Sequence, residues 1–315
     1  MRRRALVCVL LISLLASSAA AAPAIRLMLD FLPNPNHVPI YAAIENGLFQ
    51  GIEVEVLVPG DPSAPARLAA AGAVDVALTP QINYLIARDE GLPLIAIAAL
   101  IASPLGGLLS LRSAGIADLA DLRGKRVGYS LEPLEPALWR TMLASVDVGA
   151  GEVDLVNVGV STLPALLGRH VDAIGAFRNF EPIQVALLGE EPVFFKEEDY
   201  GVPWTYELVL VASTAAAETR ANELRSLVAG LAAGIAFTRA HPEEAFAGFL
   251  RAWPELDDEL DRRAYEVTLP LYADGARHDD PSAWEALQAY LLENGVTVHA
   301  FRLEELYTDR FLAED

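Results

Sequence analysis

Short apolar runs alternate with helical stretches along most of the chain. Runs such as 94–101, 153–158 and 171–176 are short, mostly apolar and bounded by turn residues, which is typical of buried strands. Between such runs, apolar residues recur three and four positions apart, as in 64–71 and 134–146, which predicts amphipathic helices. Strands that alternate with helices build α/β units, so the pattern predicts parallel sheets with helices on both faces.

The C-terminal third follows a helical pattern instead. An apolar stripe at helical spacing runs through 224–235, and Asp280, Pro281 and Ser282 supply the residues that begin a helix. Trp284 falls on the face that this second helix is expected to bury.

The first 22 residues have the pattern of a secretory signal peptide. A basic cluster, Arg2 to Arg4, precedes an apolar run that reaches Leu15, and small residues follow, with cleavage expected near Ala21. The run is too short to cross about 30 Å of hydrocarbon comfortably, which favours an exported periplasmic protein over an anchored one. The single cysteine, Cys8, lies in this segment, so we expect no disulfide framework and no thiolate metal site.

Composition narrows the range of functions. The 43 acidic residues outnumber the 23 basic ones, and the formal net charge is −20. Nucleic acids and anionic membranes require clustered cations, so this balance argues against both as partners. The chain lacks the GxSxG, HExxH, Walker A and GxGxxG motifs, and its histidines have no metal-ligand spacing. We therefore expect no catalytic residues, metal or cofactor. We also expect the protein to be a monomer.

Polar and aromatic side chains gather where the predicted strands end. Ligands of open α/β sheets bind beyond the carboxyl ends of the strands, so these positions supply the candidate site. The candidates are Asp30, Phe31, Asn34 and His37 after the first strand, Thr79 and Gln81 after the third, Ser103 after the fourth, Phe177, Asn179 and Glu181 after 171–176, and Trp204 and Tyr206 before a strand at 207–211.

The chemistry of this set indicates the class of ligand. It offers aromatic faces, amides and carboxylates, and Arg178 is the only cation near it. Aromatic rings stack on a flat heterocycle, and a carboxylate accepts hydrogen bonds from an exocyclic amine or a protonated ring nitrogen. A sulfonate, phosphate or nitrate would fit such a set less well.

Each candidate also has a structural interpretation. Asp30 and Glu207 could cap helices or pair with arginines, and Asn34 could serve only as a turn former. Phe31 could belong to the core, as could Phe177. A loop histidine such as His37 caps or packs at least as often as it takes part in chemistry.

Several segments resemble one known family. LDFLPNPNH at 29–37, GAFRNFE at 175–181 and GVPWTYELV at 201–209 are similar to segments of the thiamine-pyrimidine group of periplasmic solute-binding proteins, which serve ABC importers. DLRGKRV at 121–127 resembles the entry to the second lobe of bilobal binding proteins in general. The resemblance covers nearly all of residues 25–300.

The resemblance implies a type II periplasmic binding fold, an α/β architecture with two lobes joined by two crossover segments. After the signal peptide at 1–22, it places lobe I at 23–108 plus 210–315 and lobe II at 109–209. It also implies that Asp30, Phe31, Phe177 and Glu181 lie in the cleft between the lobes. The family often has Trp at position 31 and Tyr at position 177, and phenylalanine keeps a stacking face at both.

The function that the resemblance implies is capture of a thiamine-precursor aminopyrimidine, of the formylaminopyrimidine or hydroxymethylpyrimidine type, for an ABC permease in the inner membrane. One alternative keeps the fold and changes the ligand to a riboflavin-like ring or to a sulfonate or nitrate-type anion. The other is a thiamine-pyrimidine synthase-like enzyme. That enzyme appears in the same fold but requires a cysteine-rich motif and a lysine, whereas the exported chain is expected to have no cysteine.

Overall fold

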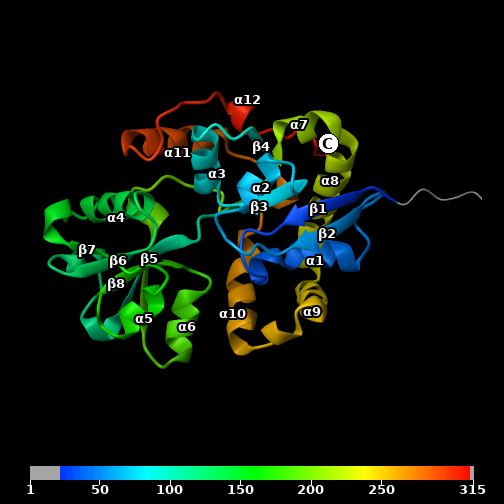
Figure 1. Cartoon of the computed structure of the whole chain (residues 1–315). Coiled ribbons are helices and arrows are strands. Elements are labelled where there is room, and N and C mark those ends of the chain that lie inside the picture. The colour runs from blue at the N-terminus through cyan, green and yellow to red at the C-terminus, as the bar shows by residue number, and fades with distance from the viewer. Residues whose placement is uncertain (1–21, 313–315) are drawn as a thin grey trace, which may run out of the picture.

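The computed structural model describes residues 22–312 and contains two five-stranded sheets, each in its own α/β lobe (Figure 1). The signal peptide predicted at the N-terminus lies outside the described residues. The first sheet has the order β2 (Glu53–Leu57), β1 (Ala24–Met28), β3 (Val76–Thr79), β10 (Leu208–Ser213) and β4 (Leu94–Ile101). The second has the order β7 (Asp154–Asn157), β6 (Arg126–Tyr129), β8 (Ala173–Phe177), β5 (Gly106–Leu111) and β9 (Pro192–Lys196). Two α/β lobes joined by two crossover segments were predicted, and this arrangement confirms them.

Both sheets are mixed, so the prediction of parallel sheets is wrong at two strands. β10 runs antiparallel to β3 and β4, and β5 runs antiparallel to β8 and β9. Each of these strands enters its sheet directly from the other lobe, and it therefore arrives in the direction opposite to strands delivered by a helix. A rule based on strand–helix alternation cannot detect this reversal.

The chain passes between the lobes twice, once between β4 and β5 and once between β9 and β10. The expected lobe boundaries after residues 108 and 209 fall inside β5 and β10. β5 has no counterpart among the predicted strands because it begins with Gly106 and Gly107. A Cβ atom on Gly107 would lie 2.2 Å from the Phe195 carbonyl oxygen, so the close approach to β9 requires glycine there.

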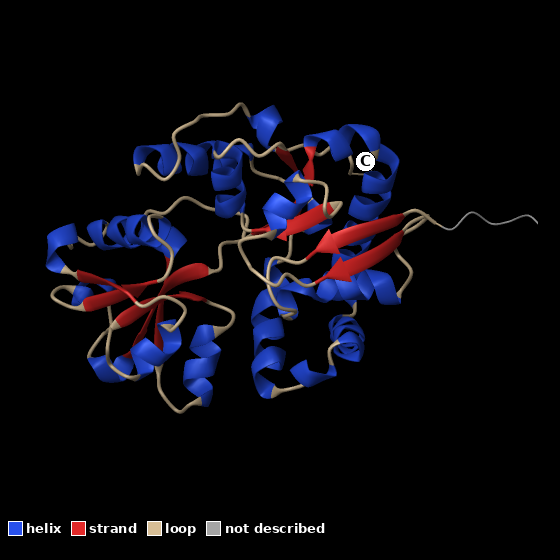
Figure 2. Ribbon diagram, in the orientation of Figure 1, coloured by secondary structure: helices blue, strands red, loops and turns tan. Residues whose placement is uncertain are grey.

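Helices flank both sheets (Figure 2). The helices are α1 (Val38–Glu45), α2 (Pro65–Ala70), α3 (Gln81–Asp89), α4 (Leu134–Ala144), α5 (Thr162–Leu167), α6 (Glu181–Leu187), α7 (Thr214–Thr219), α8 (Ala221–Ala240), α9 (Pro242–Ala252), α10 (Glu259–Thr268), α11 (Pro281–Glu293) and α12 (Leu303–Leu306). The apolar stripe predicted at 224–235 lies in α8 and is buried against the first lobe. Asp280 caps α11 as predicted, and Trp284 is fully buried.

Side-chain hydrogen bonds join the lobes on two sides of the cleft. The Asn179 amide nitrogen donates to Asn36 Oδ1 at 2.9 Å and to Thr268 Oγ1 at 2.8 Å, where α6 lies beside α10 (Figure 1). The hydroxyls of Thr141 on α4 and Tyr290 on α11 are 2.8 Å apart. The lobes therefore touch in this conformation.

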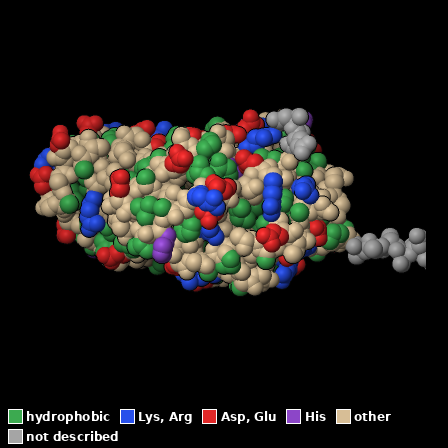
Figure 3. Space-filling view, turned by 90° about the horizontal axis from the view of Figure 1, so that it is seen from above, with side chains coloured by type: hydrophobic (Ala, Val, Ile, Leu, Met, Phe, Trp, Pro, Cys, Tyr) green, Lys and Arg blue, Asp and Glu red, His purple; other side chains and the backbone are tan. Residues whose placement is uncertain are grey.

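The surface carries charges of both signs. On the face shown in Figure 3, acidic and basic side chains are interspersed, and no continuous basic patch is visible among the described residues there. Within residues 22–312, no helix has both the length and the apolar character needed to cross a membrane.

Candidate functional site

A cavity of about 230 Å³ opens between the lobes. Its lining comes from the start of α3, the glycines that begin β5, the start of α4, the end of β8 and the chain on either side of the second crossing. Both lobes and a crossover segment thus contribute to one site, as the rule on strand ends predicts.

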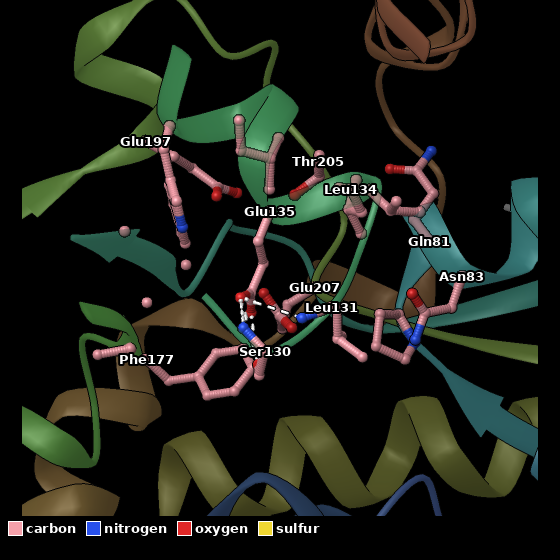
Figure 4. Close-up of a pocket in the computed structure, with 18 of the residues that line it drawn as sticks. Gln81, Asn83, Ser130, Leu131, Leu134, Glu135, Phe177, Glu197, Thr205 and Glu207 are labelled. Atoms are coloured by element: carbon pink, nitrogen blue, oxygen red, sulfur yellow. Dashed lines mark hydrogen bonds between the residues drawn. The ribbon is translucent and has the colours of Figure 1, made fainter. Parts of the chain in front are cut away.

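One wall of the cavity is apolar. Its apolar lining includes Leu131, Leu134, Leu138 and Trp139, together with Phe177, and Figure 4 shows Leu131, Leu134 and Phe177 around the space. The Trp139 ring packs so tightly under β8 that a Cβ atom on Gly175 would lie 2.6 Å from it. The wall therefore presents flat and branched surfaces to a bound molecule.

Four carboxyl groups also line the cavity, on Glu135, Glu181, Glu197 and Glu207, whereas its lining residues include no lysine or arginine. Figure 4 shows Glu135, Glu197 and Glu207 around the same space. Together these groups make the cavity a site for hydrogen-bond donors or cations rather than for anions.

Three of these carboxyls accept hydrogen bonds from backbone N–H groups. Glu135 accepts from Ser130 at 2.6 Å, and its position is fixed further by the Ser130 hydroxyl. Glu181 accepts from the Phe177 N–H at 2.8 Å, and Glu207 accepts from the Leu105 N–H at 2.9 Å.

Burial raises the pKa of three of the carboxyls. It raises the pKa of Glu197 to about 8, with a further contribution from the neighbouring Glu207, and that of Glu207 to about 7. The pKa of Glu181 is also raised by burial, and its backbone hydrogen bonds oppose the shift. The nearby Arg178 is bound to Glu198 at 2.8 Å, with both side chains largely buried, so its charge is already paired.

Four of the sequence-predicted candidates line the cavity: Gln81, Phe177, Glu181 and Tyr206. The Gln81 side-chain oxygen accepts from the Tyr206 backbone N–H at 2.8 Å, while its buried Nε2 has no partner among the described residues. The Tyr206 hydroxyl accepts from the Asp280 N–H at 2.9 Å, so it faces away from a ligand and leaves the ring to line the cavity.

The candidates after the first strand bind one another instead. His37 is fully buried, and its Nε2 lies 2.8 Å from Asp30 Oδ1. Its Nδ1 accepts from the Asn34 N–H at 3.2 Å, and Asn34 in turn caps the short helical turn 35–37. Phe31 is half exposed and does not line the cavity. In the structure Asn34 therefore forms the turn and His37 packs against Asp30. These are the structural roles that the sequence allowed for both residues.

The remaining candidates lie around the cavity without lining it. Thr79 lines a neighbouring hollow of about 160 Å³. Ser103 lies on the first crossing, and the Trp204 indole N–H on the second crossing donates to the Ala102 carbonyl at 2.9 Å. Asn179 is buried, and its side chain forms the hydrogen bonds between the lobes that were described above.

Sequence reasoning did not select Glu135, Glu197 or Trp139. Glu197 directly follows β9, so the rule that selected the other candidates could have found it. Glu135 could not be found in this way because it lies in the first turn of α4. Trp139 is buried, yet it also lines the cavity.

Comparisons with known proteins fit this geometry. The model of the NMT1/THI5-like family matches residues 34–245. A putative thiamine biosynthesis protein of Haemophilus influenzae is 39% identical over 89% of this chain and 90% of its own length. The formylaminopyrimidine-binding protein of Halalkalibacterium halodurans is 29% identical, over 88% of this chain and 87% of its own length. A 4-amino-5-hydroxymethyl-2-methylpyrimidine phosphate synthase of Legionella pneumophila is 25% identical over 92% of each chain.

The fold has solved counterparts. The alkanesulfonate-binding protein SsuA of Xanthomonas axonopodis pv. citri superposes with a TM-score of 0.69 at 14% identity, over 92% of this chain and 99% of its own. At that identity the likeness concerns the fold alone. It confirms the predicted type II periplasmic binding fold.

Proposed function

The chain belongs to the NMT1/THI5-like family, and from this premise we propose that it is the exported substrate-binding component of an ABC importer. Its ligand is a thiamine-precursor aminopyrimidine of the formylamino or hydroxymethyl type, bound in the cavity between the lobes. The observation that carries the proposal is a cavity that combines aromatic surfaces with four carboxyl groups and has no lysine or arginine in its lining.

An aminopyrimidine matches this lining group by group. Its flat ring can stack on an aromatic side chain, and its amino group donates hydrogen bonds to carboxylates. A volume of about 230 Å³ suits a single substituted ring and lies below the range of about 300–1,000 Å³ that drug-sized ligands occupy.

In the proposed complex, Phe177 stacks on one face of the pyrimidine and Glu181 accepts from its amino group. Phe31 is half exposed and reaches the opposite face only when the lobes, which already touch at Asn179, close further around the ligand, with Asp30 behind it. The permease then recognises the closed form, so that ligand binding shifts the population towards the conformation that delivers it.

Two other ligand classes fit the cavity less well. A sulfonate, which the SsuA proteins bind, would meet four carboxyl groups and no cation, because Arg178 lies outside the lining and is paired with Glu198. A riboflavin-like ring system is larger than the cavity.

The synthase of Legionella pneumophila keeps a catalytic alternative open to test. The two lysines of this chain, Lys125 and Lys196, do not line the cavity, and His37 is buried against Asp30 rather than directed into it. These placements favour binding over turnover.

The test is calorimetry on the purified mature chain, after native mass spectrometry has shown whether the chain is monomeric and carries a ligand. The panel comprises a formylaminopyrimidine, a hydroxymethylpyrimidine, an alkanesulfonate and riboflavin. We expect saturable one-to-one binding of an aminopyrimidine without turnover. Preferential binding of the sulfonate or riboflavin, or conversion of the pyrimidine, would contradict the proposal.

A further inference from the structure

Two cavity carboxyl groups mark the ends of the second crossing. Glu197 immediately follows β9, and Glu207 immediately precedes β10. The backbone of β5 lies against Glu197, since a Cβ atom on Gly106 would be 2.6 Å from its Oε2. The pair therefore occupies the junction of the lobes, with Glu135 facing the same space (Figure 4).

The Glu197 carboxyl is buried without a counter-ion of its own. It is 4% exposed, and no hydrogen bond within residues 22–312 contributes to its pKa. The charged and titratable groups that influence it, or that it influences, are Glu207, Glu198, Arg178 and Tyr290, and Arg178 is paired with Glu198. Asp30 adds further negative charge beside Glu207.

Two neutral groups in the same cavity also lack partners. The Trp139 indole Nε1 and the Gln81 amide Nε2 are buried, and neither has a hydrogen-bond partner among the described residues. Both residues line the cavity, but these two atoms are closed to solvent, as are the equally unpartnered indole nitrogens of Trp253 and Trp284 outside its lining. The Glu197 carboxyl, by contrast, lines the cavity and is not among the buried atoms closed to solvent.

Neighbouring buried carboxyls cannot both ionise at low cost, because each desolvated charge raises the pKa of the other. The pKa of Glu197 is raised to about 8 and that of Glu207 to about 7, mainly by burial. At neutral pH the pair therefore holds a proton.

We propose that Glu197, kept as a carboxylic acid beside Glu207, binds a ring nitrogen and the adjacent amino group of the ligand together. The Glu197 O–H donates to the ring nitrogen, and the amino N–H donates to the other Glu197 oxygen. No covalent bond is broken, and the complex retains the same proton if it moves to the ring. This inference rests on the proposed function and specifies the ligand as a heterocycle with an amino group next to a ring nitrogen.

The pairing requires a definite pH dependence. Above the pKa of Glu197, the free site must take up a proton in order to bind, so affinity falls by at most tenfold for each pH unit. With a pKa of about 8, binding is expected to be about 30-fold weaker at pH 9.5 than at pH 7.

The experiment is titration calorimetry with the best aminopyrimidine at pH 7 and pH 9.5, in two buffers of different ionisation enthalpy. Wild type is expected to lose about 30-fold in affinity at pH 9.5 and to take up about one proton on binding there. Glu197→Gln keeps one donor and one acceptor in place of the acid. It should bind within a few-fold of wild type at pH 7, without the loss at pH 9.5 and without proton uptake.

Two further variants sharpen the result. Glu197→Leu should lose at least tenfold at both pH values, with circular dichroism confirming that it is folded. Glu135→Gln changes a carboxyl of the same cavity that already accepts a hydrogen bond from the Ser130 N–H. Its affinity should depend on pH as that of wild type does.

Equal wild-type affinity at the two pH values, or a Glu197→Gln variant that keeps the pH dependence, would overturn the pairing and leave the proposed function standing. A wild-type protein that binds no aminopyrimidine at pH 7 would contradict both the pairing and the proposed function.

Discussion

The loop after β1 and the second crossing both present acidic side chains near the cleft, but they use them in opposite ways. In the loop, His37 Nε2 lies 2.8 Å from Asp30 Oδ1, and Asn34 donates its backbone N–H to His37 and accepts from the Asn36 N–H. On the second crossing, the Glu197 carboxyl is buried, and no group among residues 22–312 donates a hydrogen bond to it. The polar side chains of the loop therefore bond to one another, whereas the Glu197 carboxyl on the crossing can still form hydrogen bonds with a ligand.

This contrast teaches how a polar residue at a strand end should be judged. Substitutions in a satisfied cluster should mainly lower stability, because they leave a buried partner unpaired. Substitutions in an unsatisfied cluster should mainly change binding and its dependence on pH.

The largest effect concerns the stability of the ligand-free protein against pH. The pKa of Glu197 rises from 4.5 in the unfolded chain to about 8 in the fold, so the folded state binds more protons between these values. Glu197 therefore makes stability fall by up to ~4 kcal/mol as pH rises from about 4.5 to about 8, and Glu207, whose pKa is raised to about 7, adds a fall of its own. In Glu197→Gln only the Glu197 contribution should disappear, so the fall should be smaller than in wild type, as measured by urea denaturation at pH 5 and pH 8.5. Parallel pH profiles of the two proteins would contradict the assignment.

Next is the loop. His37→Ala removes a fully buried ring and leaves Asp30 without its partner, so it should lower the free energy of unfolding by about 3 kcal/mol. Urea denaturation at pH 7 measures this loss. His170→Ala, at an exposed histidine, is the control and should change stability by less than about 0.5 kcal/mol. A His37→Ala protein as stable as wild type would show that the loop is not a structural cluster.

Phe177 should show the opposite behaviour. Its side chain is 48% exposed and lines the cavity, so Phe177→Ala should leave stability almost unchanged. It should weaken aminopyrimidine binding by about 1–3 kcal/mol, the range found for loss of one stacking face. Leu188→Ala, also exposed but outside the cavity lining, is the matched control in calorimetry. Unchanged affinity in Phe177→Ala would place the ring elsewhere.

The smallest effect concerns the contacts between lobes. Asn179→Ala removes the two side-chain hydrogen bonds from the chain before α6 to Asn36 and Thr268 of the first lobe, and should weaken binding by about 1 kcal/mol because the closed form becomes less populated. Small-angle scattering should give a larger radius of gyration for the ligand-free variant. Thr141→Val cuts the contact on the other side of the cleft and should act in the same direction. If neither variant opens the protein, these contacts do not hold the lobes together.

Much of the fold follows from the sequence because it is local. The apolar run at 94–101 is β4 without a change of boundary, and the Asp280 cap begins α11. β5 could not be predicted, because its glycines signal a bend locally and become a strand only through contact with β8 and β9. The antiparallel direction of β10 likewise could not be predicted, because this strand enters its sheet from the other lobe and pairs there with β3 and β4.

The site is harder to predict because the tertiary structure decides which polar groups already have a hydrogen-bond partner. Residue type and position selected Gln81, Phe177, Glu181 and Tyr206, which line the cavity. The same rule also selected His37, whose bonds are made within its own loop. Sequence shows which groups can form hydrogen bonds, whereas the structure shows which of them remain available.

The most direct test of the account is a calorimetric comparison of a formylaminopyrimidine with an alkanesulfonate on the wild-type mature chain at pH 7. The carboxyl-lined cavity predicts saturable binding of the pyrimidine and no measurable heat of binding from the sulfonate. Tighter binding of the sulfonate would contradict the central claim that this cavity selects a nitrogen-rich ring over an anion.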